Sequence, residues 1–419
     1  MVNNQKKNEE KWDYQTLDNC LELLTDYDSN GSFADMAANV HTEWGHGYAW
    51  YVRATDLEQK LNMSEVKYAD EYSYNFLKKT SLYGGELLMA KRGEIGKIYY
   101  FQMKSRYATL APNLYLLKLN DEMDSRFLYY YFLSNEGQKK LKAINASTSL
   151  GAIYKDDVKK LLVPKIDVTE QRAIAETLAD LDTTINKLMK LIQKKRNIRQ
   201  GTMQLLVTGK ERLSGFDGEW VKINLAKNSK LKARIGWQGL TTAEYLDDGY
   251  SYLITGTDFR DGQIYWSDCH YVDYDRYAQD PNIQVSNGDL LLTKDGTIGK
   301  VAYVTNLKRP ATLNSGVFLV KPITDAYTAH FMFYVLESSV FKDFLQQLSA
   351  GSTINHLYQK DLVKFDLFVP PTKDEQEAIA GILFDMDSDI HELEEKLSKY
   401  MKIKQGVMED LLTGKVRLV

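Results

Sequence analysis

Two stretches of the chain carry apolar residues in alternating steps of four and three, with polar residues between them. This spacing lines the apolar side chains along one seam of a helix and predicts a coiled coil. The seam positions are Ile174, Leu178, Leu181, Ile185, Leu188 and Ile192 in the first stretch, and Ile379, Leu383, Met386, Ile390, Leu393 and Leu397 in the second. Prolines 164 and 370 precede the helices, and Thr169 and Asp374 are the expected N-caps.

The charges along the two helices predict how they pair. The first helix begins with acidic residues such as Glu170 and ends with basic ones such as Arg199, and the second repeats this order. Laid parallel, the helices would set like charges against each other, whereas an antiparallel arrangement brings opposite charges together. We therefore expect one intramolecular antiparallel coiled coil. Two solvated helices docked separately are the alternative.

The rest of the chain is duplicated as well, with a period of roughly 200 residues. Residues 170–213 align without gaps on residues 375–418, and roughly half of the positions are identical. Upstream, Gly85-Glu86-Leu87-Leu88 returns as Gly288-Asp289-Leu290-Leu291, and Trp12 and Trp220 open the two copies. The period is far longer than that of a solenoid, so the repeat is a duplicated domain.

The patterns in both globular halves mix strands and helices. Residues 84–100 and 287–304 are typical of a strand, a glycine-containing hairpin turn and a second strand. Residues 114–119 and 317–321 predict strands, and residues 125–141 and 328–348 predict aromatic-rich helices. Each half is therefore expected to be an α/β (α+β) domain built around a twisted sheet.

Composition restricts the function without identifying it. The net charge of −4 excludes a protein that wraps DNA by charge alone, but it leaves local basic patches open. The only two cysteines, Cys20 and Cys269, lie too far apart in sequence to suggest a zinc or disulfide framework, and free thiols suit a reducing cytoplasm. The sequence shows no apolar run of membrane length, and its polar first ten residues are unlike a signal peptide.

Two motifs that could carry chemistry are incomplete. Residues 26–31 resemble the start of a calcium-binding loop, but Ala37 stands where that loop needs a glutamate, so a polar turn is the better interpretation. Residues 296–300 hint at a phosphate loop but lack its spacing and its hydroxyl residue, which favours a tight hairpin presenting Lys294 and Lys300. We expect no catalytic residues, no metal ligands and no cofactor bound by this chain.

Two loops have the composition of a nucleic-acid recognition surface. Residues 234–239 combine Arg234, Trp237 and Gln238 with glycines, and residues 44–48 have a similar texture. Such loops can enter a groove, contact phosphates and read base edges. Glycine-rich surface loops with an aromatic plug are the alternative.

Together these features resemble the specificity subunit of Type I restriction–modification systems. Two variable recognition domains alternate in that family with two near-identical helical regions. The resemblance covers the whole chain and rests on the Glu-Gln-x-x-Ile-Ala entry to each helix (170–175 and 375–380) and the Thr-Gly-Lys exit (208–210 and 413–415). Residues 216–220 look like the junction that opens a second recognition domain, and the first domain departs more from the family pattern than the second.

The resemblance implies recognition domains at residues 1–168 and 214–373 and helical regions at 169–213 and 374–419. It implies double-stranded DNA, two methyltransferase subunits and restriction–translocase subunits as partners, with S-adenosylmethionine, ATP and Mg²⁺ bound by those partners. The candidate DNA contacts are Trp44, His46, Tyr48, Arg53, Lys91, Arg92, Lys97, Arg234, Trp237, Gln238, Thr257, Lys294, Thr297 and Lys300. The alternatives are an orphan or regulatory specificity subunit, a protein-binding coiled-coil scaffold, and an enzyme that modifies or cleaves DNA by itself.

Overall fold

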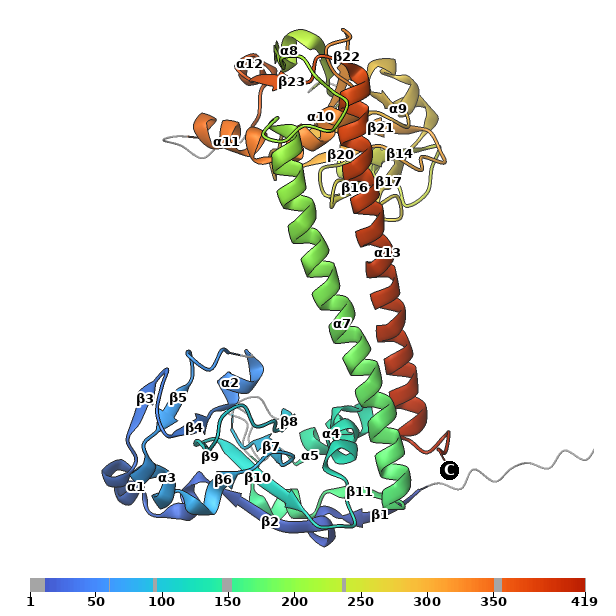
Figure 1. Ribbon diagram of the computed structural model, residues 1–419. Coiled ribbons are helices and arrows are strands. Elements are labelled where there is room, and N and C mark those ends of the chain that lie inside the picture. Colours follow the sequence, from blue (N-terminus) through green and yellow to red (C-terminus); the bar gives the residue numbers. More distant parts are fainter. Residues whose placement is uncertain are drawn as a thin grey trace, which may run out of the picture. The chain divides into compact units, whose positions relative to one another are not determined.

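The computed structural model describes residues 12–59, 61–92, 96–144, 153–235, 239–349 and 356–418 (Figure 1). The chain divides into two compact units, the first formed by residues 1–189 and 396–419 and the second by residues 190–395. Both divisions fall within long helices, α7 (Val168–Val207) and α13 (Lys373–Leu411). Each unit therefore contains one globular half and a part of both helices.

The parts of α7 and α13 in each unit pair in an antiparallel manner, as predicted. In the second unit Lys195 lies 2.6 Å from Asp389, and Arg199 lies 2.8 Å from Asp387, so the residue number on α13 falls as that on α7 rises. In the first unit Lys404 donates to Asp182 at 2.6 Å. All twelve predicted seam residues are buried or half-buried, so the heptad interpretation is confirmed.

Both predicted N-caps are two residues too late. Asp167 caps α7 because its carboxylate accepts a hydrogen bond from the backbone of Thr169 at 2.8 Å. Thr372 caps α13 because its hydroxyl accepts from the backbone of Glu375 at 3.3 Å. Thr169 and Asp374 themselves lie within the first turn of their helices.

Among the described residues, the globular half of the first unit contains three sheets. The strands of the four-stranded sheet follow the order β2-β10-β7-β8, and those of the five-stranded sheet follow the order β3-β5-β4-β9-β6, in which only β4 and β9 pair in parallel. A two-stranded sheet joins β1 to β11. The strands are β1 (Asp13–Thr16), β2 (Leu21–Asp26), β3 (Thr42–Trp44), β4 (Ala49–Val52), β5 (Lys67–Ala69), β6 (Ser81–Leu82), β7 (Leu87–Ala90), β8 (Ile98–Tyr100), β9 (Ala108–Leu110), β10 (Leu114–Leu119) and β11 (Leu162–Lys165). The helices are α1 (Phe33–Asn39), α2 (Ala54–Glu58), α3 (Glu71–Phe76), α4 (Ser125–Leu133), α5 (Asn135–Ala143) and α6 (Lys155–Lys159).

The second unit repeats this plan. Its main sheets follow the orders β13-β22-β19-β20 and β17-β14-β21-β18, with β14 and β21 in parallel, and β12 pairs with β23 and β15 with β16. The strands are β12 (Val221–Asn224), β13 (Ser229–Lys232), β14 (Ser251–Ile254), β15 (Phe259–Arg260), β16 (Gln263–Ile264), β17 (His270–Val272), β18 (Gln284–Val285), β19 (Leu290–Thr293), β20 (Val301–Tyr303), β21 (Ala311–Leu313), β22 (Val317–Pro322) and β23 (Asp366–Val369). The helices are α8 (Leu225–Asn228), α9 (Tyr274–Ala278), α10 (Ala329–Glu337), α11 (Ser339–Leu348) and α12 (Gln359–Leu362).

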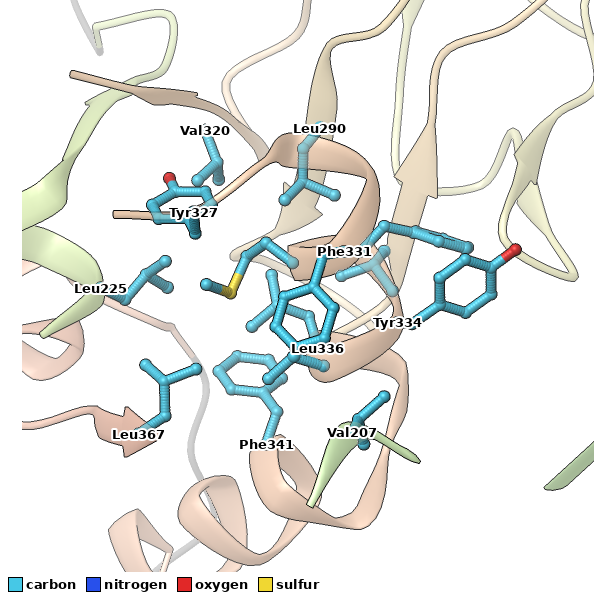
Figure 2. Packing of buried hydrophobic residues seen from close by; sticks show 14 of the residues in the cluster. Val207, Leu225, Leu290, Val320, Tyr327, Phe331, Tyr334, Leu336, Phe341 and Leu367 are labelled. Atoms are coloured by element: carbon cyan, nitrogen blue, oxygen red, sulfur yellow. The ribbon is translucent and has the colours of Figure 1, made fainter. Parts of the chain in front are cut away.

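Alternate residues of one sheet fill two cores, because successive side chains of a strand point to opposite faces. On β19, Leu290 and Leu292 join the core shared with α10 and with the long helices, whereas Leu291 joins the core of the other main sheet. Figure 2 shows Phe331 and Leu336 of α10 packed in the first of these cores. The globular half and the helices of each unit therefore share one core.

The predicted hairpins and strands are confirmed, but each predicted aromatic-rich helix is two helices. Ser134 ends α4 and begins α5, since its hydroxyl donates to the carbonyl of Tyr131 at 2.6 Å and accepts from the backbone of Gly137 at 3.2 Å. Ser338 interrupts α10 and α11 in the same way. Among the described helices, none has the length and apolar character that a membrane span needs.

Candidate nucleic-acid interface

The polar residues singled out in the second unit gather near the carboxyl ends of the parallel strands β14 and β21. The backbone of Asn314, just after β21, donates to the carbonyl of Ile254 at 2.9 Å, and its side chain donates to Tyr245 at 2.6 Å. After β14, the carboxylate of Asp258 accepts from the backbone of Thr255 at 2.7 Å, which leaves Thr257 exposed at the turn. The sequence pointed to residues 255–259 but gave no sign of Asn314 or Tyr245.

The buried side chain of Arg234 donates hydrogen bonds to the carboxyl end of β21. Its side chain donates to the carbonyl of Leu313 at 2.9 Å and to the hydroxyl of Thr312 at 3.2 Å, and the residue is 2% exposed. Burial lowers the pKa of its guanidinium. Nη1 is buried and has no hydrogen-bond partner within the described residues. Arg234 therefore contacts the protein and not solvent, while its predicted DNA contact stays a prediction.

The β19–β20 hairpin borders the same site. The hydroxyl of Thr293 donates to the carbonyl of Thr297 at 2.6 Å and accepts from the backbone of Lys300 at 2.9 Å, which closes the turn. The backbone of Lys294 donates to the carbonyl of Gly316 at 2.9 Å. Thr297 is exposed, and Lys294 and Lys300 are half-buried. A Cβ at Gly256 would lie 2.9 Å from the Thr293 side chain, so the structure brings the predicted residues 257, 294, 297 and 300 to one region. Trp237 and Gln238 lie outside the described residues.

In the first unit, Trp44 is the most prominent feature of the corresponding site. The residue is 58% exposed. The Arg53 guanidinium carbon lies 4.6 Å and the Lys67 ammonium 5.2 Å from the ring centroid, which are cation–π distances. Arg53 is held in place by Asp56, whose carboxylate accepts from its Nε at 2.9 Å. The sequence pointed to Trp44 and Arg53 but missed Lys67, which lies in no glycine-rich loop.

The predicted residues His46 and Tyr48 lie in the connection between β3 and β4, and Tyr48 directly precedes β4, at the amino ends of the parallel strands and not at their carboxyl ends. His46 is exposed and lies 3.5 Å from Glu43. The ring of Tyr48 stacks on Tyr107 at a centroid distance of 4.7 Å and lies 5.6 Å from Tyr74. Desolvation and then the neighbouring Tyr107 raise the pKa of Tyr48 to about 12.

Lys91 lies in an internal ion-pair network. Its ammonium lies 2.8 Å from Asp26 and 2.6 Å from Asp28, and the residue is only 7% exposed. Lys155 also donates to Asp26, at 2.8 Å. These two aspartates belong to the segment that resembles a calcium-binding loop, and here lysines neutralise them. The Lys91 ammonium therefore binds carboxylates of its own chain, and its predicted DNA contact stays a prediction.

The remaining basic candidates of the first unit differ in exposure. Arg92 is exposed, and Lys97 lies 3.1 Å from Glu58.

The backbone of Lys91 donates to the carbonyl of Asn113 at 2.9 Å, which matches the bond from Lys294 to Gly316 in the second unit. The two units therefore keep the same backbone frame but place different side chains on it.

Comparison with known proteins is consistent with this frame. The family model described as "Type I restriction modification DNA specificity domain" matches residues 34–200 and 239–402. The chain is 24% identical, over 427 residues, to the putative type I restriction enzyme MjaX specificity subunit of Methanocaldococcus jannaschii, covering 98% of this chain and 94% of that protein. It is 25% identical to the MjaVIII specificity subunit of the same organism over 316 residues, covering 71% and 72% of the two chains.

Two solved structures share the fold. The S subunit of a Type-I restriction-modification system from M. genitalium matches with a TM-score of 0.62 at 17% identity, covering 98% of this chain and 99% of that one. A chain from a structure on complex assembly and conformational transition of the type I R-M system matches with a TM-score of 0.53 at 14% identity, covering 97% and 99%.

Proposed function

Because the chain belongs to the Type I restriction modification DNA specificity family, we propose that it recognises a bipartite DNA target, with each unit reading one half-site. The observation that carries this proposal is the duplicated frame with unlike side chains. In the second unit the site holds Arg234 beneath the end of β21, and in the first it holds the exposed Trp44 with two cations close to its ring. Unlike side chains on one frame are what two different half-sites require.

The chemistry belongs to partner subunits in this proposal. Two methyltransferase subunits bind S-adenosylmethionine and methylate adenine N6 after flipping the base out of the duplex. Restriction–translocase subunits use ATP and Mg²⁺ to move along DNA and cleave it. The chain itself selects the sequence and holds no catalytic residue. No group of His, Cys, Asp and Glu suited to a metal ion is present among the described residues.

The repeat sets an expectation for the target. Two like-built domains on one face of B-DNA read half-sites about one helical turn apart, centre to centre. Half-sites of a few base pairs then leave an unread spacer on the order of six base pairs.

The experiment is co-expression of the chain with its methyltransferase subunit, followed by genome-wide mapping of N6-methyladenine by single-molecule sequencing. The expected result is a split motif with two short, unlike half-sites and a fixed spacer. If both proteins are soluble and associated but no new methylation appears, the proposal fails. DNA binding by the purified complex then separates an orphan specificity subunit, which binds, from a protein scaffold, which does not. Methylation or nicking by the purified chain alone identifies an enzyme.

A further inference from the structure

A tyrosine, an aspartate and a cation connect helices α4, α7 and α13 in the first unit. Tyr130 of α4 donates a hydrogen bond to the carboxylate of Asp182 on α7 at 2.8 Å. Lys404 of α13 donates to the other oxygen of the same carboxylate at 2.6 Å. Tyr130 is 5% exposed. The contact ties the globular half directly to both long helices, and we call it the first clamp.

The second unit contains the same contact at the equivalent positions. Tyr334 of α10 donates to Asp387 on α13 at 3.0 Å, and Arg199 of α7 donates to that carboxylate at 2.8 and 3.0 Å. This second clamp contains one more residue, Glu337 at the end of α10, which accepts a hydrogen bond from Arg199. In the first unit the position equivalent to Glu337 is Leu133, whose side chain cannot accept a hydrogen bond.

The surroundings of the two clamps also differ. A cavity of about 760 Å³ lies beside the first clamp, lined among others by Tyr130, Asp182, Lys404, Arg126 and Ala179. In the second unit, phenylalanine replaces the alanine and histidine replaces the arginine. The His330 ring stacks on Tyr303 at 5.0 Å and packs edge-on against Phe384 at 5.6 Å. Aromatic rings therefore brace the second clamp on the side where Ala179 and Arg126 leave open space at the first. A pocket of about 440 Å³ also borders the second clamp, lined among others by Arg199, Glu337 and Asp387 but not by these rings.

We propose that the clamps are positioning contacts that hold each recognition domain at a set angle on the helices of its own unit, and that the first is the more compliant. The proposal rests on the proposed function, since the angle of each domain determines where its half-site lies. Each clamp joins α4 or α10, which pack under the main sheet of the domain, to α7 and α13, which form the frame. Release of the tyrosine lets the domain tilt without unfolding it, because the ring stays buried in the shared core.

The test uses Tyr130→Phe and Tyr334→Phe in the complex with the methyltransferase, and it compares DNA affinity for the native spacer with that for a spacer one base pair longer or shorter. Loss of a hydrogen bond to a charged group changes an equilibrium constant by a factor of about ten. We expect Tyr130→Phe to lower the discrimination between spacers by about tenfold. Tyr334→Phe should lower it by about twofold, since Arg199 still joins α10 to both long helices.

Tyr14→Phe is the matched control, because Tyr14 also donates to a carboxylate, that of Glu136 at 3.0 Å, but both residues lie outside α7 and α13. It should leave spacer discrimination unchanged. The double substitution Ala179→Phe with Arg126→His copies the bracing of the second unit. It should raise the discrimination between spacers by about threefold, which is less than the effect of about tenfold expected from one hydrogen bond. A purely structural role predicts lower stability without a change in spacer preference.

Unchanged spacer discrimination in Tyr130→Phe, with the wild-type complex binding its split target, overturns the inference and leaves the proposed function standing. Equal losses in Tyr130→Phe and Tyr334→Phe overturn the claim that the first clamp is more compliant. A wild-type complex that binds no split target contradicts the proposed function itself, whatever the variants do.

Discussion

Arg417 donates two hydrogen bonds to the carboxylate of Glu170, at 2.7 and 2.6 Å, although 247 residues separate the two in sequence. Glu170 is only 1% exposed. The second unit repeats the contact, with Arg212 donating to the buried Glu375 at 2.9 and 2.6 Å. In each unit, a residue that follows one long helix thus neutralises the carboxylate that begins the other. This explains the glutamate of the repeated Glu-Gln motif.

Removing the arginine should destabilise the unit strongly, because it leaves a buried carboxylate without a counter-charge. We expect Arg417→Ala to lower the free energy of unfolding by about 3 kcal/mol in urea titrations. Adding Glu170→Gln to Arg417→Ala should restore part of this loss, since the buried charge is then gone. A loss below about 0.5 kcal/mol, the range of ordinary surface substitutions, would contradict this interpretation.

Substitution of the glycines in the two Thr-Gly-Lys exits should destabilise the fold, because of their backbone conformation and because of a neighbouring tryptophan ring. Gly209 and Gly414 have φ values of +68° and +75°, the left-handed conformation that ends many helices. A Cβ would lie 3.2 Å from the Trp220 ring in one case and 2.9 Å from that of Trp12 in the other. We expect Gly414→Ala to cost about 2 kcal/mol and Gly209→Ala about 1 kcal/mol in urea titrations.

Gly201 provides the matched control within α7. A Cβ added there meets no atom within 4 Å, so alanine gains helix propensity without a clash. Gly201→Ala should stabilise the chain by about 1 kcal/mol. If the alanine variants at positions 414 and 201 change stability in the same direction, the close approach of Trp12 does not constrain the exit.

Lys67 and Lys91 should differ in their effects on DNA binding. Lys67 is half-exposed beside Trp44, whereas Lys91 is engaged by Asp26 and Asp28. If Lys67 contacts a phosphate, Lys67→Ala weakens DNA binding and reduces the slope of log affinity against log salt by about one. Lys91→Ala should destabilise the fold and leave that slope unchanged. Affinities measured at several salt concentrations decide this, and a changed slope in Lys91→Ala would restore Lys91 as a phosphate contact.

The stability contributed by Asp26 should depend on acid pH. Burial acts to raise the pKa of Asp26, but hydrogen bonds from Lys155 and Lys91 outweigh it and hold the pKa below 3.8. A carboxylate with a lowered pKa stabilises the folded state above pH 3.8 and loses this contribution as the pH falls through its folded-state pKa. Asp26→Asn should therefore be less stable than the wild type at pH 7, and the difference should shrink below pH 3.8. A difference that does not depend on pH would rule out the ion pair as its source.

The sequence predicted those parts of the fold that depend on local periodicity. Heptad steps located α7 and α13, and glycine turns between apolar runs located the β7–β8 and β19–β20 hairpins. The parallel pairing of β14 with β21 was not predicted, since it joins Tyr252 to Ala311 across several intervening elements. The break at Ser134 was missed because no proline marks it, and a single hydroxyl ends one helix and begins the next.

The site was harder to predict than the fold, because burial depends on distant residues. Arg234 lies in a glycine-rich stretch that suggests exposure, yet Thr312 and Leu313, far along the chain, enclose its guanidinium. Lys91 resembles a surface cation until Asp26, 65 residues earlier, is placed beside it. Lys67 carries no local motif, and only the pairing of β3 with β5 brings it to Trp44.

The length of the two long helices should set the spacer of the target. The division between the units crosses α7 after residue 189 and α13 after residue 395. One added heptad at both points preserves the seam and lengthens each helix by roughly 10 Å at 1.5 Å per residue. That length corresponds to about three base pairs of DNA.

We expect methylation maps to show the same half-sites with a spacer about three base pairs longer. The same seven residues placed between Gly215 and Gly218 lengthen neither helix and should therefore leave the spacer unchanged. There is room for them, because a Cβ at Gly215 meets no atom within 4 Å. A spacer that stays fixed after both helices are lengthened would show that the helices do not measure it.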